Sequence, residues 1–136
     1  VDYKVIAQVK KILSIPLMAS GDVFSPVLAQ RMMEETGCDG LVVARGALGN
    51  PWIFKELSAL LKDKPLPARP DKSEIAAVMT GHLASCVDFY GERVGVMIFR
   101  KFFSWYTRGF RRIRTLREKS SRIKTHREME KTIGEA

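Results

Sequence analysis

The sequence is poor in the features that metal centres, disulfides and membrane spans need. It holds two cysteines in 136 residues, and Cys38 and Cys86 lie far apart without forming a CxxC pattern. Two isolated cysteines are typical of buried thiols in a reducing compartment, so we expect a cytoplasmic protein with no metal site and no disulfide. No apolar run approaches the roughly 20 residues of a membrane-spanning helix, and we expect no membrane partner.

Catalytic constellations are scarce as well. The two histidines, His82 and His126, are isolated and lie in segments that we expect to be helical. Because no Ser/His/Asp or Cys/His arrangement accompanies them, a satisfied or exposed histidine is favoured over a catalytic one. The sequence by itself shows no catalytic acid, base or nucleophile. It also begins without a methionine or a signal peptide, so we expect a piece of a longer protein.

Negative charge is scarce in the second half of the chain. Residues 1–70 carry 9 basic and 7 acidic side chains, whereas residues 71–136 carry 14 and 8. The imbalance is sharpest in residues 100–124, where ten Lys/Arg stand against one acid, Glu118. Such a block favours a polyanionic partner over a small substrate, with a plain solvated helical surface as the alternative.

The first half alternates between helical and strand patterns. We predict helices at 3–13, 26–36 and 51–61, and strands at 15–19 and 40–44. This alternation with short links is typical of a parallel sheet. Two strands can neither close a barrel nor fill an open sheet, so these residues should be the tail of a larger α/β unit. Bare strand edges and apolar faces lead us to expect that the isolated chain dimerises, swaps elements or distorts in this half.

Each predicted strand ends in a turn of small or polar residues. The residues of the two turns are Ser20, Gly21, Asp22, Ala44, Arg45 and Gly46. Because the carboxyl ends of parallel strands share one edge, both turns should lie on the same rim, where α/β barrels commonly bind phosphate. Asn50 and Pro51 then suit the start of a helix, so helix N–H groups beside Arg45 predict an anion site. An ordinary strand-to-helix connection is the alternative, with Asp22 only a turn residue.

A proline-rich stretch, KDKPLPARP at 62–70, predicts a stiff linker. The predicted organisation is an α/β part at 1–62, a linker at 63–70 and an all-α part at 71–136. The helix predicted at 92–107 is apolar over most of its circumference. Its polar stripe consists of Arg100, Lys101, Ser104, Thr107 and Arg108, and further basic residues run from Arg111 to Lys124. Trp105 and Tyr106 could stack on bases, but aromatic residues at helical spacing favour a core role.

Three segments resemble the tRNA-dihydrouridine synthases and follow the order of that family. They are IPLMASGDV at 15–23, TGCDGLVVARGALGNPWIF at 36–54 and FRKFFSWYTRG at 99–109. The first two are shared more loosely by other flavin-dependent barrels, and the third is more specific. The resemblance implies the last two βα units of an FMN-bearing (β/α)8 TIM barrel followed by a C-terminal helical bundle domain, with tRNA lying across both. It also implies that NADPH reduces the flavin, which passes hydride to a uracil carbon while a cysteine on an earlier loop supplies the proton.

The resemblance assigns the FMN phosphate and ribityl contacts to the six turn residues. Ser20 stands where the family has asparagine and Ala44 where it has glycine, changes that backbone contacts survive. Phe102 replaces the usual histidine of the helical segment. We expect RNA contacts at Arg100, Lys101, Arg108, Arg111, Arg112 and Arg114. The family's catalytic cysteine is not in this chain, so the chain alone should neither hold FMN firmly nor reduce uridine.

The sequence therefore predicts the C-terminal fragment of an FMN- and NADPH-dependent tRNA-dihydrouridine synthase. Two alternatives remain at this point. One is a non-catalytic RNA-binding helical module. The other is another FMN-dependent barrel oxidoreductase with a small-molecule substrate, although such a substrate has no need of the basic block at 100–124.

Overall fold

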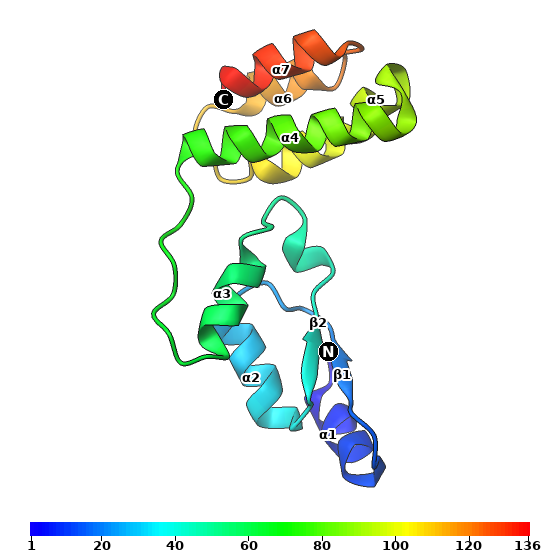
Figure 1. The fold of residues 1–136 in the computed structure, drawn as a ribbon, viewed down its shortest axis with the longest axis vertical. Coiled ribbons are helices and arrows are strands. Elements are labelled where there is room, and N and C mark those ends of the chain that lie inside the picture. Colours follow the sequence, from blue (N-terminus) through cyan, green and yellow to red (C-terminus); the bar gives the residue numbers. More distant parts are fainter. The chain divides into compact units, whose positions relative to one another are not determined.

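The computed structural model describes all residues from 1 to 136. The chain divides into two compact units, Val1–Ala68 and Arg69–Ala136, and the division falls inside the proline-rich stretch. We call them unit 1 and unit 2. Unit 1 is of mixed α/β structure, and unit 2 is entirely helical (Figure 1).

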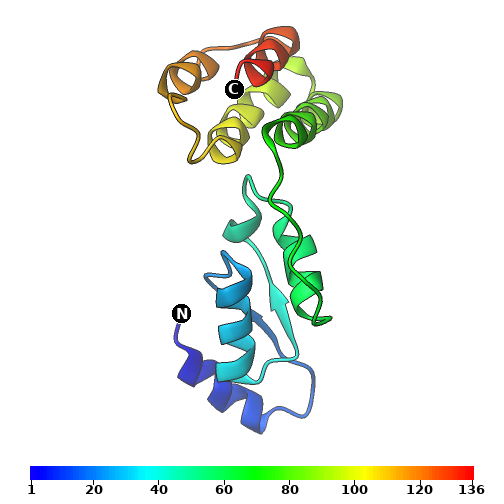
Figure 2. The ribbon, with the colours of Figure 1, turned by 90° about the vertical axis from the view of Figure 1, so that its left-hand side faces the viewer.

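Unit 1 runs helix, strand, helix, strand, helix, as predicted. Its elements are α1 (Tyr3–Ile12), β1 (Met18–Ser20), α2 (Pro26–Thr36), β2 (Gly40–Val42), the 3-10 turn η1 (Arg45–Ala47) and α3 (Ile53–Leu60) (Figure 2). The two strands pair in parallel, with Met18 opposite Gly40 and Ser20 opposite Val42. Parallel pairing of the two predicted strands is thereby confirmed.

The ends of α2 follow local sequence signals. The Ser25 hydroxyl accepts a hydrogen bond from the Leu28 amide at 3.3 Å, which satisfies one free N–H of the first turn. Pro26 occupies the start of the helix, and Gly37 closes it in the left-handed conformation at φ 65°. Both helix boundaries therefore lie where capping chemistry predicts them.

Both strands are shorter than predicted. The Leu17 amide donates to the Asp39 carboxylate at 2.7 Å rather than to a strand partner, so the ladder begins only at Met18. That amide and the Lys10 ammonium, 2.6 Å away, lower the pKa of Asp39. At the other end, the backbone leaves the extended conformation at Ala44 and enters η1.

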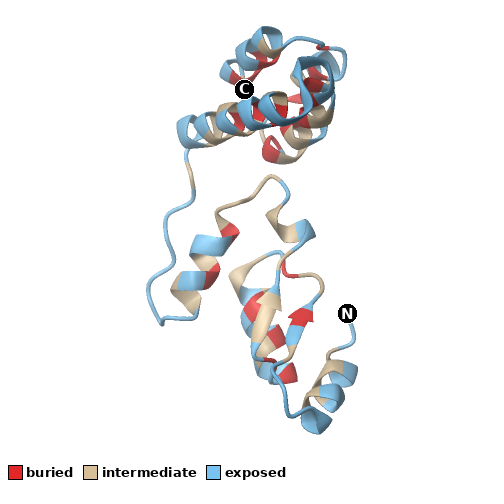
Figure 3. Cartoon of the chain, turned by 45° about the vertical axis from the view of Figure 1, so that its right-hand side comes forward, coloured by how far each residue is buried: buried red, intermediate tan, exposed pale blue.

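One face of the small sheet is covered and the other is open. Ala19 is buried and Leu41 partly buried against the core of α2 and α3, which includes Met32 and Ile53. On the opposite face, Met18 is 57% exposed and Val42 46% exposed. Helix α1 buries no residue at all, although its spacing makes it amphipathic (Figure 3). Unit 1 thus keeps apolar surface that a larger sheet would cover.

Unit 2 consists of four helices around one core. They are α4 (Lys72–Tyr90), α5 (Glu92–Tyr106), α6 (Arg114–Ser120) and α7 (His126–Gly134). The fully buried large side chains include Met79, Leu83, Phe99, Phe103 and Met129, which come from α4, α5 and α7. In Figure 3 the buried residues of this unit lie on the sides of the helices that face one another.

Side chains cap the first turns of two helices of unit 2. The Asp71 carboxylate accepts from the Glu74 amide at 2.8 Å, and this bond lowers the pKa of Asp71. The Thr125 hydroxyl accepts from the Glu128 amide at 3.4 Å. Helices α4 and α7 therefore start directly after residues whose side chains cap them.

Cys38 and Cys86 are both free and buried. No group of three or more His, Cys, Asp or Glu side chains is placed to hold a metal ion. None of the helices combines the length and the apolar character that crossing a bilayer requires.

Candidate functional site

The two predicted turns meet in one cleft of about 160 Å³. All six predicted turn residues line it: Ser20, Gly21, Asp22, Ala44, Arg45 and Gly46, with Val23, Phe24 and Val42 beside them. The parallel register explains the meeting, because Ser20 lies opposite Val42 and both turns leave the sheet at the same edge. The sequence thus correctly predicted the proximity of two turns whose residues are more than 20 positions apart in the chain.

Arg45 provides the positive charge of the cleft. One terminal nitrogen of its guanidinium donates to the Asp22 carboxylate at 2.8 Å, and the group also lies 5.7 Å from the centre of the Phe24 ring. The Arg45 side chain is 73% exposed, so this ion pair adds little to stability. A guanidinium has five N–H donors, and Asp22 occupies one of them. The remaining donors can bind an anion from solvent.

Gly46 is required by the packing of one turn against the other. A Cβ atom there would lie 1.9 Å from the Val23 carbonyl oxygen, a distance that no side chain tolerates. The absence of a side chain is what lets the two turns approach. The Gly46 amide donates to no backbone carbonyl, so it remains available to a ligand.

The prediction that the N-terminus of a helix contributes to the anion site is wrong. Helix α3 begins at Ile53 rather than at Pro51, and the Ile53 amide donates to the main-chain carbonyl of Asn50. The amides of Ala47 and Leu48 are used by the carbonyls of the preceding 3-10 turn. No residue of α3 lines the cleft. The anion-binding capacity therefore rests on Arg45 and the neighbouring turn rather than on a helix N-terminus.

The cleft fits the phosphate end of FMN better than the whole cofactor. A guanidinium and a free glycine amide are the donors that a phosphate prefers. The volume of about 160 Å³ is well below the roughly 300–1,000 Å³ of sites that enclose a ligand of cofactor size. The isoalloxazine ring therefore needs walls that these residues do not provide.

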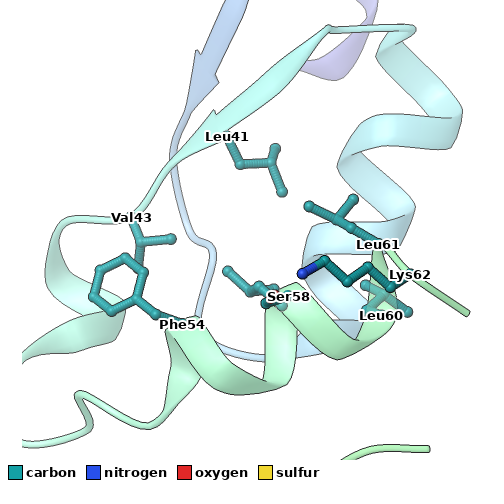
Figure 4. A pocket seen from close by; sticks show the side chains of 8 residues that line it. Leu41, Val43, Phe54, Ser58, Leu60, Leu61 and Lys62 are labelled. Carbon is teal, nitrogen blue, oxygen red and sulfur yellow. The ribbon is translucent and has the colours of Figure 1, made fainter. Parts of the chain in front are cut away.

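A second concavity lies on the other side of β2. This groove of about 290 Å³ is mainly apolar and is lined by Leu41, Val43, Phe54, Leu57, Ser58, Leu60, Leu61 and Lys62. Figure 4 shows Leu41 and Val43 on the strand side and Phe54 and Leu61 on the helix side. The free edge of β2 borders it, because β2 pairs with β1 alone. The only polar side chains of the groove are Ser58 and Lys62.

In unit 2, the predicted RNA-binding residues have different environments. Arg100 is partly buried and donates from two nitrogens to the Ile123 carbonyl. Arg114 is exposed and pairs with Glu118 at 3.0 Å. The other four are exposed and have no ion pair or side-chain hydrogen bond: Lys101, Arg108, Arg111 and Arg112.

The predicted polar stripe on α5 is therefore no uniform basic surface. Thr107 is fully buried, and Arg117 donates to its hydroxyl and to the Ser104 carbonyl. Sequence reasoning counted Arg117 within a basic run and missed this structural role. The signal that could have revealed part of it is Thr107, a small hydroxyl residue at the end of a largely apolar helix, which needs a partner when it is buried.

Tyr106 and His82 of unit 2 form part of its core. Tyr106 is 8% exposed, and its hydroxyl lies 3.2 Å from His82 Nδ1. The His82 ring also contacts Phe99 and Phe102, and burial lowers its pKa. Burial chiefly, with the nearby Cys86 thiol, raises the pKa of Tyr106. The core interpretation of Tyr106 and the satisfied-histidine interpretation of His82 are confirmed.

Comparison with known proteins connects both units to one family. The model of the dihydrouridine synthase (Dus) family matches residues 1–136. A probable tRNA-dihydrouridine synthase of Mycobacterium leprae is 39% identical over 130 residues, which cover 95% of this chain and 34% of that protein. tRNA-dihydrouridine synthase B of Pseudomonas aeruginosa is 43% identical over 106 residues, which cover 77% of this chain and 32% of that protein. tRNA-dihydrouridine synthase B of Vibrio cholerae is 37% identical over 124 residues, which cover 91% of this chain and 38% of that protein.

The chain spans about a third of the length of the curated relatives it matches. The family match nevertheless runs through the rim turns of unit 1 and all four helices of unit 2. This match over residues 1–136 agrees with the resemblance of the three sequence segments. The chain belongs to the dihydrouridine synthase family.

Proposed function

We propose that this chain is part of an FMN-dependent tRNA-dihydrouridine synthase, a cytoplasmic oxidoreductase that reduces uridines in tRNA with NADPH. The observation that carries the proposal is the meeting of the two rim turns around Arg45 in a member of this family. Unit 1 would contact the FMN phosphate and ribityl chain, and unit 2 would contact tRNA. The names of the relatives, which specify tRNA, favour this substrate over a small molecule.

Within this function, the chain's own residues bind and orient rather than react. Arg45 and Gly46 would hold the phosphate, and the 20–22 turn would line the same cleft. FMN supplies the redox chemistry when it is bound. No side chain of the cleft is a nucleophile or proton donor in the manner of the family's cysteine, so residues outside this chain must complete the catalytic site.

The cofactor part is tested with Arg45→Ala in the full-length enzyme. Removing one charge-assisted hydrogen bond to the phosphate should weaken FMN binding by about 1.5–3 kcal/mol, or roughly 10- to 150-fold in Kd. Flavin fluorescence titration measures it. Arg31→Ala is the matched control, because Arg31 is an exposed arginine of unit 1 that pairs with Glu35 away from the cleft. Equal FMN affinity in both variants would reduce Arg45 to a surface residue.

A second candidate function, an RNA-binding module without chemistry of its own, is favoured by the exposed and unpaired arginines of unit 2. The chain should bind tRNA weakly, and its affinity should fall steeply with salt because binding releases counterions. Arg111→Ala/Arg112→Ala/Arg114→Ala should shrink the slope of log K against log salt by roughly one unit for each phosphate-binding arginine removed.

The matched control removes the same charge from unit 1. Lys55, Lys62 and Lys64 are exposed, and the triple alanine variant there should leave the slope unchanged. tRNA binding measured at four or more salt concentrations decides the matter. A flat salt response of the unchanged chain, or equal binding by the two triple variants, would leave the basic block as an ordinary solvated surface.

A further inference from the structure

The segment 107–113 between α5 and α6, which we call the arginine loop, concentrates free positive charge. Three of its seven residues are arginines and none is acidic. Arg108, Arg111 and Arg112 are all exposed and engage in no ion pair or side-chain hydrogen bond. The backbone turns sharply between them, with φ of 87° at Gly109 and 57° at Arg112. Nothing within the loop offsets the repulsion among its three charges.

The inner side of the loop is fixed at three points. Thr107 is fully buried at its beginning, and Ile113 is 7% exposed at its end. In between, the Phe110 ring lies 5.1 Å from the Lys72 ammonium. Anchored in this way, the loop directs its arginines to solvent while its apolar and hydroxyl side chains face the helices.

Arg117 connects the start of the loop to the helix that follows it. Its Nε donates to the Thr107 hydroxyl at 3.2 Å, and a terminal nitrogen donates to the Ser104 carbonyl at 3.1 Å. Ser104 is in the last turn of α5, where carbonyls lack helical partners, and an arginine is well suited to satisfy one. The planar guanidinium therefore joins α5 and α6 across both ends of the loop.

We propose that Arg117 is a positioning residue that holds the arginine loop so that Arg108, Arg111 and Arg112 meet the phosphates of an RNA backbone together. This inference rests on the proposed tRNA-binding function of unit 2. Without the two hydrogen bonds of Arg117, charge repulsion would let the three arginine side chains adopt many arrangements. An RNA would then have to order them on binding, which lowers its affinity. Arg117 acts through the loop and makes no contact with RNA itself.

Two variants of the 136-residue chain test the proposal. Arg117→Ala removes both hydrogen bonds of the guanidinium. Thr107→Val removes the hydroxyl that accepts one of them and leaves the net charge unchanged. When log K is plotted against log salt, each phosphate contact contributes a slope of about −0.9. Each contact therefore lowers the affinity roughly fivefold when the salt concentration rises from about 0.15 to about 1 M. We expect Arg117→Ala to raise the Kd for tRNA roughly tenfold and to shrink the salt slope by more than one unit. Thr107→Val should raise the Kd roughly threefold or more, since the loop loses its orientation but no charge.

Matched controls separate positioning from loss of charge and from loss of stability. Arg122→Ala removes one exposed, unpaired arginine outside the loop. Thr132→Val removes a second fully buried hydroxyl, one that donates to the Glu128 carbonyl in α7. Each control should change the Kd about twofold or less, and far-ultraviolet circular dichroism checks that every variant is folded.

A double-mutant cycle supplies the decisive readout. If Arg117 acts through the loop, adding Arg111→Ala/Arg112→Ala to Arg117→Ala should weaken binding by much less than it does in the unchanged chain. Additive losses, or a Thr107→Val variant that binds tRNA as well as Thr132→Val does, would overturn the positioning role. If Arg117→Ala does not fold, Thr107→Val decides alone. Salt-independent binding by the unchanged chain would instead refute the proposed function.

Discussion

Units 1 and 2 are of equal length but differ in how completely they bury their apolar side chains. In unit 2, helices from both ends of its sequence enclose Phe99, Phe103 and Met129 completely. In unit 1, the sheet has two strands, one face is open, and no residue of α1 is fully buried. Ile12 of α1 is 83% exposed, although Tyr3 and Ile6 of the same helix pack against the core.

This difference shows which unit carries its own fold. A parallel sheet is stable when both of its faces are covered, and two strands cannot supply that cover to each other. Further strands would continue the sheet at the outer edges of β1 and β2, and the open face around Val42 is apolar surface that unit 1 leaves uncovered. Unit 1 therefore leaves more of its apolar surface uncovered than unit 2, in which the exposed large apolar side chains are Phe89, Tyr90, Val94 and Met97.

Separating the units should give the largest effect. Residues 69–136 alone should unfold in one cooperative thermal transition, because their core is complete. Residues 1–68 alone should bind the dye ANS and melt without a sharp transition, because their exposed apolar faces have no partner. Circular dichroism melting and ANS fluorescence of the two fragments measure this. A sharply melting monomeric 1–68 fragment that binds no ANS would remove the contrast between the units.

Truncating a core aromatic residue should give the next largest effect. Phe103 is fully buried on α5, and Phe103→Ala should lower the free energy of unfolding by about 3–5 kcal/mol. Phe89→Ala makes the same chemical change where the side chain is 80% exposed, and it should cost well under about 1 kcal/mol. Urea unfolding followed by circular dichroism provides both values. Similar losses in the two variants would mean that the core of unit 2 is not closed.

The features that the sequence predicted correctly are local or follow from topology. Ser25 and Gly37 bound α2 because capping depends on a few neighbouring residues. The two rim turns meet because parallel strands must end at a common edge. Arg45 was found in this way, without any knowledge of its partner Asp22.

The features that the sequence did not predict depend on contacts between distant residues. The Asp39 carboxylate captures the Leu17 amide and so shortens β1, which no local preference of residues 15–19 reveals. A stripe of arginine and threonine on a helix has the same spacing whether it faces water or another helix. Only the position of Ile123 and α6 decides that Arg100 and Thr107 turn inward.

Two glycines of unit 2 should change stability in opposite directions. A Cβ at Gly95 would lie 2.5 Å from the Cys86 carbonyl oxygen, where α4 and α5 approach closely, so Gly95→Ala should destabilise by about 1–3 kcal/mol. At Gly81 on α4 a Cβ meets nothing within 4 Å, and Gly81→Ala should stabilise by roughly 0.5–1 kcal/mol. Urea midpoints of the two variants provide the check. Stabilisation by Gly95→Ala would show that the two helices are less closely packed.

The pH dependence should distinguish the units by the smallest effect. Burial lowers the pKa of His82 in unit 2 from its ordinary value of 6.5, so below about pH 6.5 the unfolded chain binds more protons than the folded one. Stability of unit 2 should therefore fall as the pH drops from 6.5 through the folded pKa. In unit 1 the Asp39 pKa is also lowered, but its stabilising contribution is lost only below the ordinary value of 3.8. His82→Phe should flatten the melting temperature of residues 69–136 between about pH 7 and pH 5, and a profile parallel to that of the unchanged chain would show that His82 does not set it.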